Sequence, residues 1–154
     1  MKAIKRIVVC IDFSVYSSEI LEYAAGVAER NSAEIVAVNV INKRQIESIK
    51  EAINNEQLRT RVLSDFINDQ TEKRIKNMDD LFNQWVPKQV STKIIIKSGV
   101  PFEEILRVVD GENADLLVIS SKGRTNFEDY MFGTTAEKVF RHCPVPILSL
   151  NVKK

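Results

Sequence analysis

The sequence contains little of what several classes of protein require. Only two of its 154 residues are cysteine, Cys10 and Cys143, and only one is histidine, His142. These residues form neither a metal-ligand pattern nor the disulfide framework of a small secreted protein. The formal net charge is +1, so no broad charged field attracts nucleic acid or anionic lipid. We therefore expect no metal site, no nucleic-acid partner and no membrane partner.

Long apolar runs are also absent. No stretch approaches the roughly 20 residues that span a bilayer. The sequence starts MKAIKRIVVCIDFS, but Asp12 interrupts its apolar run and no small-residue cleavage site follows. A length of 154 residues with 44% hydrophobic and 28% charged residues is typical of one globular domain. We expect a cytoplasmic protein with a single domain over residues 1–154.

The two cysteines do not predict thiol chemistry. Cys10 lies inside an apolar run and is expected to pack as a small buried hydrophobe. Cys143 lies beside Pro144 in a predicted loop, and a reactive thiol there would need a positively charged, exposed environment.

Strand and helix patterns alternate along the chain. β-Branched apolar runs predict buried parallel strands, and apolar residues at helical spacing predict helices between them. The pattern predicts a doubly wound α/β fold, a five-stranded parallel sheet with right-handed crossovers. The predicted strands are residues 6–11, 34–41, 92–97, 116–120 and 145–150, and the clearest helices are residues 14–31, 101–113 and 134–142. Pro146 predicts that the last strand lies at an edge.

Residues 44–86 are polar but periodic. Ile46, Ile49 and Ile53 share one helical face, and Ile75, Met78, Phe82 and Trp85 share another. Asn54 and Asn55 separate the two helices, and Pro87 ends the second. One interpretation is a helix that covers the sheet after a mobile connection, which the apolar stripe favours. The other is a lid or an arm that binds a partner.

Ligands of doubly wound sheets bind outside the carboxyl ends of the strands, where the strand order reverses. This rule directs attention to the loops after the first, second and fourth strands. They contain Asp12, Asn42 and residues 121–132.

Three segments together resemble the universal stress protein family. They are IDFS after the first strand, AVNVIN at the end of the second, and VISSKGRTNFEDYMFGTTAEKV, which is followed by CPVPIL. The phosphate motif of that family reads G-x2-G-x9-G-[ST]. Here Gly123 and Gly133 are separated by nine residues, Thr134 follows, and Ser120 stands at the position of the first glycine.

The resemblance implies an adenine nucleotide alpha hydrolase-like fold with strand order 3-2-1-4-5. It also implies a stress-response regulatory protein that forms a homodimer through its last strand, residues 145–150. The implied ligand is ATP or AMP, with or without Mg²⁺. Position by position, Asp12 and Val40 would contact the adenine and ribose, and Ser120, Gly123, Gly133 and Thr134 would contact the phosphates.

The chemistry of the glycine-containing loop is compatible with this role. Glycine lets backbone N–H groups approach a ligand closely, and the first N–H groups of a helix favour phosphate. Thr134 adds a hydroxyl, while Lys122 and Arg124 add positive charge. The alternative is that Gly123 only forms a turn, and that Gly133 and Thr134 only cap a helix. Ser14 or Ser17 is expected to cap the first helix, and Asp12 could also cap it, whether or not it binds a ligand.

Two other functions compete with nucleotide binding. The chain lacks the P-loop pattern, and His142 is expected at a helix end rather than as a general base, so we expect no enzyme. Slow ATP hydrolysis remains open, because Asp12, Glu128 and Asp129 could hold Mg²⁺ with the phosphates. The third candidate is a nucleotide-free dimeric scaffold. Its best support is Ser120, whose Cβ takes up space that glycine leaves free.

Overall fold

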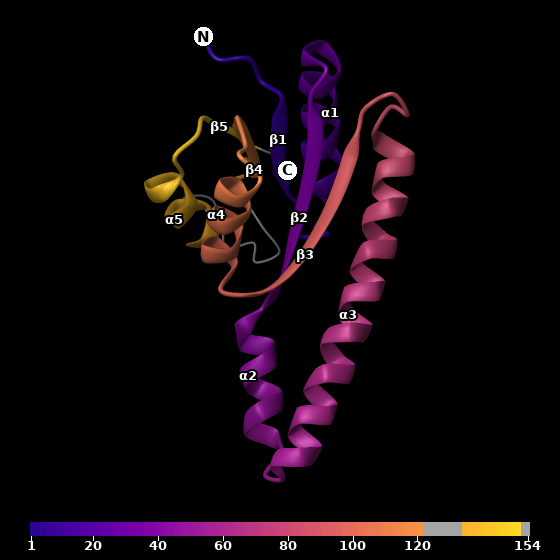
Figure 1. Ribbon diagram of the computed structural model, residues 1–154, viewed down its shortest axis with the longest axis vertical. Helices are drawn as coiled ribbons and strands as arrows, with labels where there is room; N and C mark the ends of the chain where they lie inside the picture. Colours follow the sequence, from indigo (N-terminus) through magenta and orange to yellow (C-terminus); the bar gives the residue numbers. More distant parts are fainter. Residues whose placement is uncertain (122–133, 152–154) are drawn as a thin grey trace.

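Five parallel strands form one sheet at the centre of the molecule (Figure 1). The computed structural model describes residues 1–121 and 134–151. The strand order is β3-β2-β1-β4-β5, as the family resemblance implies. The strands are β1 (Arg6–Cys10), β2 (Glu34–Asn42), β3 (Thr92–Gly99), β4 (Leu116–Ser120) and β5 (Ile147–Leu150). The predicted doubly wound parallel sheet is therefore confirmed, and β5 lies at one edge.

The central strands form because their sequences are apolar on both faces. All five residues of β4 are buried, and Val8 in β1 is completely inaccessible to solvent. Val8 pairs with Val36 of β2 on one side and with Leu117 of β4 on the other. Such continuous β-branched runs need cover on both faces, which the helices supply.

Helices cover the two faces of the sheet in two layers. On one face, α1 (Ser17–Asn31) and the carboxyl-terminal half of α3 (Glu56–Trp85) pack against Ile35 and Ala37 of β2. On the other face, α4 (Pro101–Gly111) and α5 (Thr134–His142) pack against Val36 and Val38. Successive strand residues point to opposite faces, so β2 contributes alternately to both cores.

The first helix begins three residues later than its sequence predicts. Its N-cap is Tyr16, which makes no side-chain capping bond, so the predicted capping by Ser14 or Ser17 is wrong. The hydroxyl of Ser14 instead accepts a hydrogen bond from the Tyr16 N–H, at 3.3 Å, within the preceding turn. Phe13 has φ +60°, a left-handed conformation that no helix continues.

Between β2 and β3 the chain forms two helices, α2 (Lys43–Ala52) and α3. Asn55 caps α3 by accepting a hydrogen bond from the Leu58 N–H, so the predicted break between two helices is confirmed. Figure 1 shows that α2 and the first half of α3 extend beyond the sheet as a hairpin, which we call the helical arm, residues 43–71. The segment that was expected to be a mobile connection before the covering helix is therefore itself helical.

Only the second half of α3 forms the expected cover of the sheet. Met78 is 0% and Phe82 8% exposed, but Ile75 is 39% exposed and does not belong to the buried face. The predicted stripe through Ile75 is therefore wrong at that residue. Arg74, 8% exposed, takes the buried position one turn before Met78.

Among the described residues, no helix combines the length and apolar character needed to cross a membrane.

Candidate functional site

The strands end at different heights along the carboxyl edge of the sheet. β1 stops pairing with β2 at Cys10, opposite Val38, whereas β2 continues beside β3 as far as Asn42, opposite Gly99. The last backbone bond from β1 to β2 runs from the Ile11 N–H to the Val38 carbonyl, at 2.9 Å. The end of β1 beside the continuing part of β2 forms a step in the edge of the sheet. The step lies next to the junction of β1 and β4, where the direction of strand order reverses.

Asp12 lies directly after β1, in the turn that leads to α1. Its Oδ1 accepts hydrogen bonds from the Ser14 N–H, at 2.9 Å, and from the Ser17 hydroxyl, at 3.3 Å. The carboxylate therefore holds the turn together and is not the N-cap of the helix, which corrects that alternative. The turn fixes Asp12 at the switch point.

Val40 lies in the part of β2 that extends past the end of β1. Peptide groups two residues apart in a strand point to the same edge, so Val40 directs its N–H and C=O the same way as Val38. The Val38 carbonyl accepts the hydrogen bond from the Ile11 N–H, and Val40 lies two residues further along β2. Its side chain packs with the α4 and α5 core, so the backbone is the part of Val40 that faces the step.

Two buried polar residues near this step, Asn39 and Arg74, were not predicted as site residues from the sequence. The Asn39 amide Nδ2 donates to the Ile11 carbonyl, at 2.7 Å, and its Oδ1 accepts from Nη1 of Arg74, at 2.7 Å. The same Nη1 donates to the Val40 carbonyl at 3.3 Å. The sequence contained two signals that could have identified this pair. Asn39 is a polar residue inside an apolar strand, and Arg74 is a cation one helical turn before Met78.

Ser120 and Thr134 lie at the ends of two further elements. Ser120, 9% exposed, is the last residue of β4 and is in register with Leu150 of β5. Thr134 is exposed and is the first residue of α5. The chain enters β5 shortly after α5 ends, so the start of α5 faces the carboxyl edge of the sheet.

The structure thus brings Asp12, Val40 and Ser120 to the carboxyl ends of three neighbouring strands. Thr134 begins a helix that starts at the same carboxyl edge of the sheet. The other predicted site residues lie outside the described residues. They are Gly123 and Gly133, with the neighbouring Lys122, Arg124, Glu128 and Asp129.

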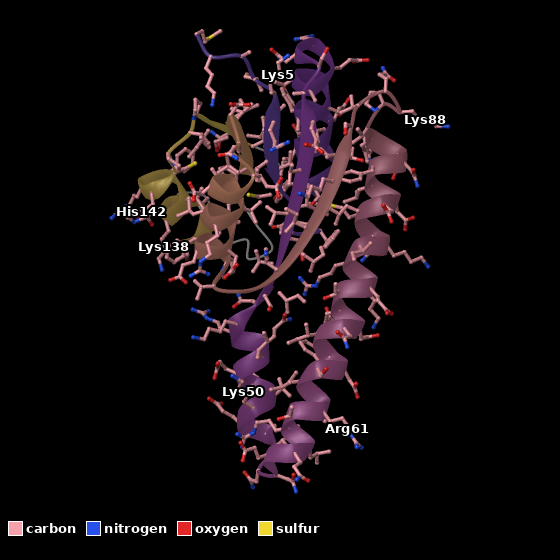
Figure 2. All side chains as sticks on the ribbon, in the orientation of Figure 1. Lys5, Lys50, Arg61, Lys88, Lys138 and His142 are labelled. Atoms are coloured by element: carbon pink, nitrogen blue, oxygen red, sulfur yellow. The ribbon has the colours of Figure 1, made fainter. Side chains whose placement is uncertain are left out.

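His142 lies far from this edge. It is the last residue of α5, as expected, and the sheet strand that follows starts at the amino edge. Figure 2 shows its side chain on the outer side of α5. Within residues 1–121 and 134–151, no group of three or more histidine, cysteine or acidic side chains could hold a metal ion.

The two thiols lie in apolar surroundings. Burial raises the pKa of Cys10 far above its ordinary value, with smaller contributions from Cys143 and Asp12. Burial also raises the pKa of Cys143. Both side chains pack against the α4 and α5 core, which keeps them in the protonated, unreactive form at neutral pH.

The model of the universal stress protein family matches residues 3–150, nearly the whole chain. The chain belongs to the universal stress protein family. Universal stress protein MJ0531 of Methanocaldococcus jannaschii is 27% identical over 152 residues, which cover 97% of this chain and 85% of that protein.

Solved structures of the family share the fold. The structure of protein MJ0577 has a TM-score of 0.83 and 24% identity, and the match covers 99% of both chains. A universal stress protein of Archaeoglobus fulgidus in complex with dAMP has a TM-score of 0.65 and 15% identity, covering 97% of this chain and all of that one. A further structure, with a TM-score of 0.62 and 17% identity, is a universal stress protein in complex with cAMP; the match covers 97% of this chain and 98% of that one.

Proposed function

We propose that this universal stress protein binds an adenine nucleotide, ATP or AMP, at the carboxyl edge of its sheet. The observation that carries the proposal is the step where β2 extends past β1, with the Val40 peptide and Asp12 beside it. Relatives of the same fold in complex with dAMP and cAMP support an adenine ligand.

In the proposed complex the adenine and ribose lie against Asp12 and the Val40 backbone. A backbone N–H and C=O can bond the acceptor and donor on an adenine edge, and a carboxylate can accept from ribose hydroxyls. The phosphates lie against the segment of Ser120, Gly123, Gly133 and Thr134. Thr134 supports this assignment because the first N–H groups of α5 favour an anion. Mg²⁺ would accompany ATP as a partner of its phosphates.

Ser120 is compatible with weaker phosphate binding. It is only 9% exposed, so little of its surface faces solvent at the edge. If the family's first glycine contributes chiefly an N–H group, serine contributes the same group. We expect Ser120 to weaken the phosphate site without closing it.

We further propose that the protein is a regulator that acts as a homodimer through its last strand. β5 lies at the sheet edge and pairs only with β4 among the described strands. An edge strand of this kind can pair with the same strand of a second copy about a two-fold axis. A cytoplasmic role in the stress response then depends on a partner that recognises the dimer.

Native mass spectrometry of the purified protein tests the nucleotide proposal. A co-purifying mass of AMP or ATP on the dimer is the expected result. A clean dimer that takes up no added ATP would instead favour the nucleotide-free scaffold, which Ser120 supports. Release of phosphate from added ATP would favour slow hydrolysis, which the position of His142 argues against.

A further inference from the structure

Arg74 reaches the nucleotide-binding edge from a helix that is distant in the sequence. It lies on α3, 35 residues from Asn39, yet its Nη1 contacts the Asn39 Oδ1 at 2.7 Å and the Val40 carbonyl at 3.3 Å. Its Nε donates to the Gln70 Oε1 at 3.3 Å, which orients the guanidinium along its own helix. The guanidinium is held in place from both elements.

Asn39 links this guanidinium to the end of β1. In a continuous parallel ladder the Ile11 carbonyl would accept the next N–H of β2, after the bond from Ile11 to Val38. Here it accepts from the Asn39 side chain, at 2.7 Å. The ladder thus ends on a side-chain amide, and the Val40 peptide is released from β1. Asn39 is 5% and Arg74 8% exposed, so both bonds are shielded from water.

We propose that Arg74 and Asn39 are positioning residues that hold the Val40 peptide as the edge that distinguishes adenine from guanine. This rests on the proposed nucleotide binding. Adenine offers an amino donor beside a ring acceptor, which matches a C=O beside an N–H, whereas guanine places a carbonyl oxygen where adenine has its amino group. A carbonyl has two lone pairs, so the bond from Arg74 orients the Val40 oxygen and leaves one lone pair for a base.

The test compares the dissociation constants of ATP and GTP for the wild type and two variants. Arg74→Met keeps the length of the side chain but removes all donors. Because hydrogen bonds to a charged group are among the stronger ones, we expect the preference for ATP over GTP to fall by roughly tenfold. Arg74→Lys keeps the charge but not the forked donors, so its preference should lie between those of the wild type and Arg74→Met.

Met78→Ala is the matched control. Met78 lies one turn further along the same face of α3, is 0% exposed and packs in the opposite core from the Val40 side chain. It should lower the melting temperature, as Arg74→Met does, yet keep the wild-type ATP/GTP ratio. A ratio that falls equally in Met78→Ala would reduce Arg74 to a structural role and overturn the inference.

The binding measurements distinguish a failure of the positioning role from a failure of the proposed nucleotide binding. If the wild type prefers ATP and both Arg74 variants keep that preference, only the positioning role is wrong. Should Arg74→Met not fold, Arg74→Lys decides alone, and an unchanged ratio there contradicts the inference. If the wild type binds no adenine nucleotide, the proposed function fails and this inference falls with it.

Discussion

Asn39 stands in an apolar strand, and its side chain replaces a backbone group at the end of the β1 ladder. Buried polar residues are tolerated where they are hydrogen-bonded, and Asn39 has a partner on each side, the Ile11 carbonyl and Arg74. At the residue scale, the hydrogen bonds of Asn39 and Arg74 therefore fix the backbone at the end of β1 and at Val40.

Asp115 is the described residue whose protonation is most clearly linked to stability. The Lys2 ammonium and the N–H groups of Lys5 and Arg6 lower the pKa of Asp115 to about 2, from 3.8. The folded state therefore favours the ionised form. Its contribution is fully present above pH 4 or so, and is lost as the pH falls through about 2.

We therefore expect Asp115→Asn to lower the free energy of unfolding by about 1 to 2 kcal/mol at pH 7, since Lys2 is exposed and partly screened. Urea unfolding at pH 7 and near pH 2 measures the difference, which should shrink at the lower pH. Asp110→Asn, an exposed acidic residue at the end of α4, is the control for net charge. Equal losses at both pH values would refute the linkage.

Cys143→Ser should leave the oligomeric state and ligand affinity unchanged. Burial keeps both thiols protonated, so neither is expected to act as a nucleophile. Thiol labelling at neutral pH should be slow in the native protein and fast after unfolding. Loss of ligand binding in this variant alone would contradict the packing role.

At the scale of elements, neither strands nor helices were uniformly easier to predict: α5 matches its predicted residues 134–142, whereas β5 begins at Ile147, two residues after its predicted start. β4 was predicted to the residue because its run of apolar residues ends at Ser120 and Ser121. β3 runs on to Gly99, past the predicted Lys97, because pairing with β2 continues into polar residues. α1 starts late because Asp12 and Ser14 stabilise a turn, a local competition that propensity alone does not decide.

The helical arm and the contact of Arg74 with β2 depend on long-range packing. Ile46, Ile49 and Ile53 give the period of a helix, but not the length by which it leaves the sheet. The candidate site shows the same limit. The places of Asp12 after β1 and of Val40 late in β2 could be predicted from the sequence, whereas the pairing of Asn39 with Arg74 needs the fold to bring α3 to β2.

Asn55 gives a direct test of the boundary between the helices of the arm. Its side chain accepts from the Leu58 N–H at 2.9 Å, so Asn55→Ala should destabilise the start of α3 by about 1 kcal/mol. Asn54→Ala, the preceding exposed residue, is the matched control and should change little. Hydrogen exchange of the first turn of α3 measures the effect. Similar exchange in both variants would contradict the cap.

At the scale of the whole molecule, the proposed dimer is tested through the edge strand. Ile147 begins β5, and Ile147→Lys should shift a dimer towards monomer in sedimentation while its melt shows that it remains folded. Ile147→Val is the control and should stay dimeric. A wild type that sediments only as monomer would remove the dimer from the account.

The nucleotide proposal predicts a ligand-dependent gain in stability of the whole fold. At a ligand concentration about one hundred times the dissociation constant, binding adds about 2.7 kcal/mol. For a chain of this size, the melting temperature should rise by roughly 5 to 11 °C. Gly133→Val is the negative control, because the motif expects glycine where the phosphates approach the backbone, and it should abolish the rise.

The most direct measurement is the melting temperature of wild type and Ser120→Gly with and without millimolar ATP and Mg²⁺. We expect both proteins to be stabilised, with Ser120→Gly stabilised at least as much, because removal of the serine Cβ opens space for the phosphates. If ATP stabilises neither protein, the nucleotide proposal is wrong and the dimeric scaffold takes its place.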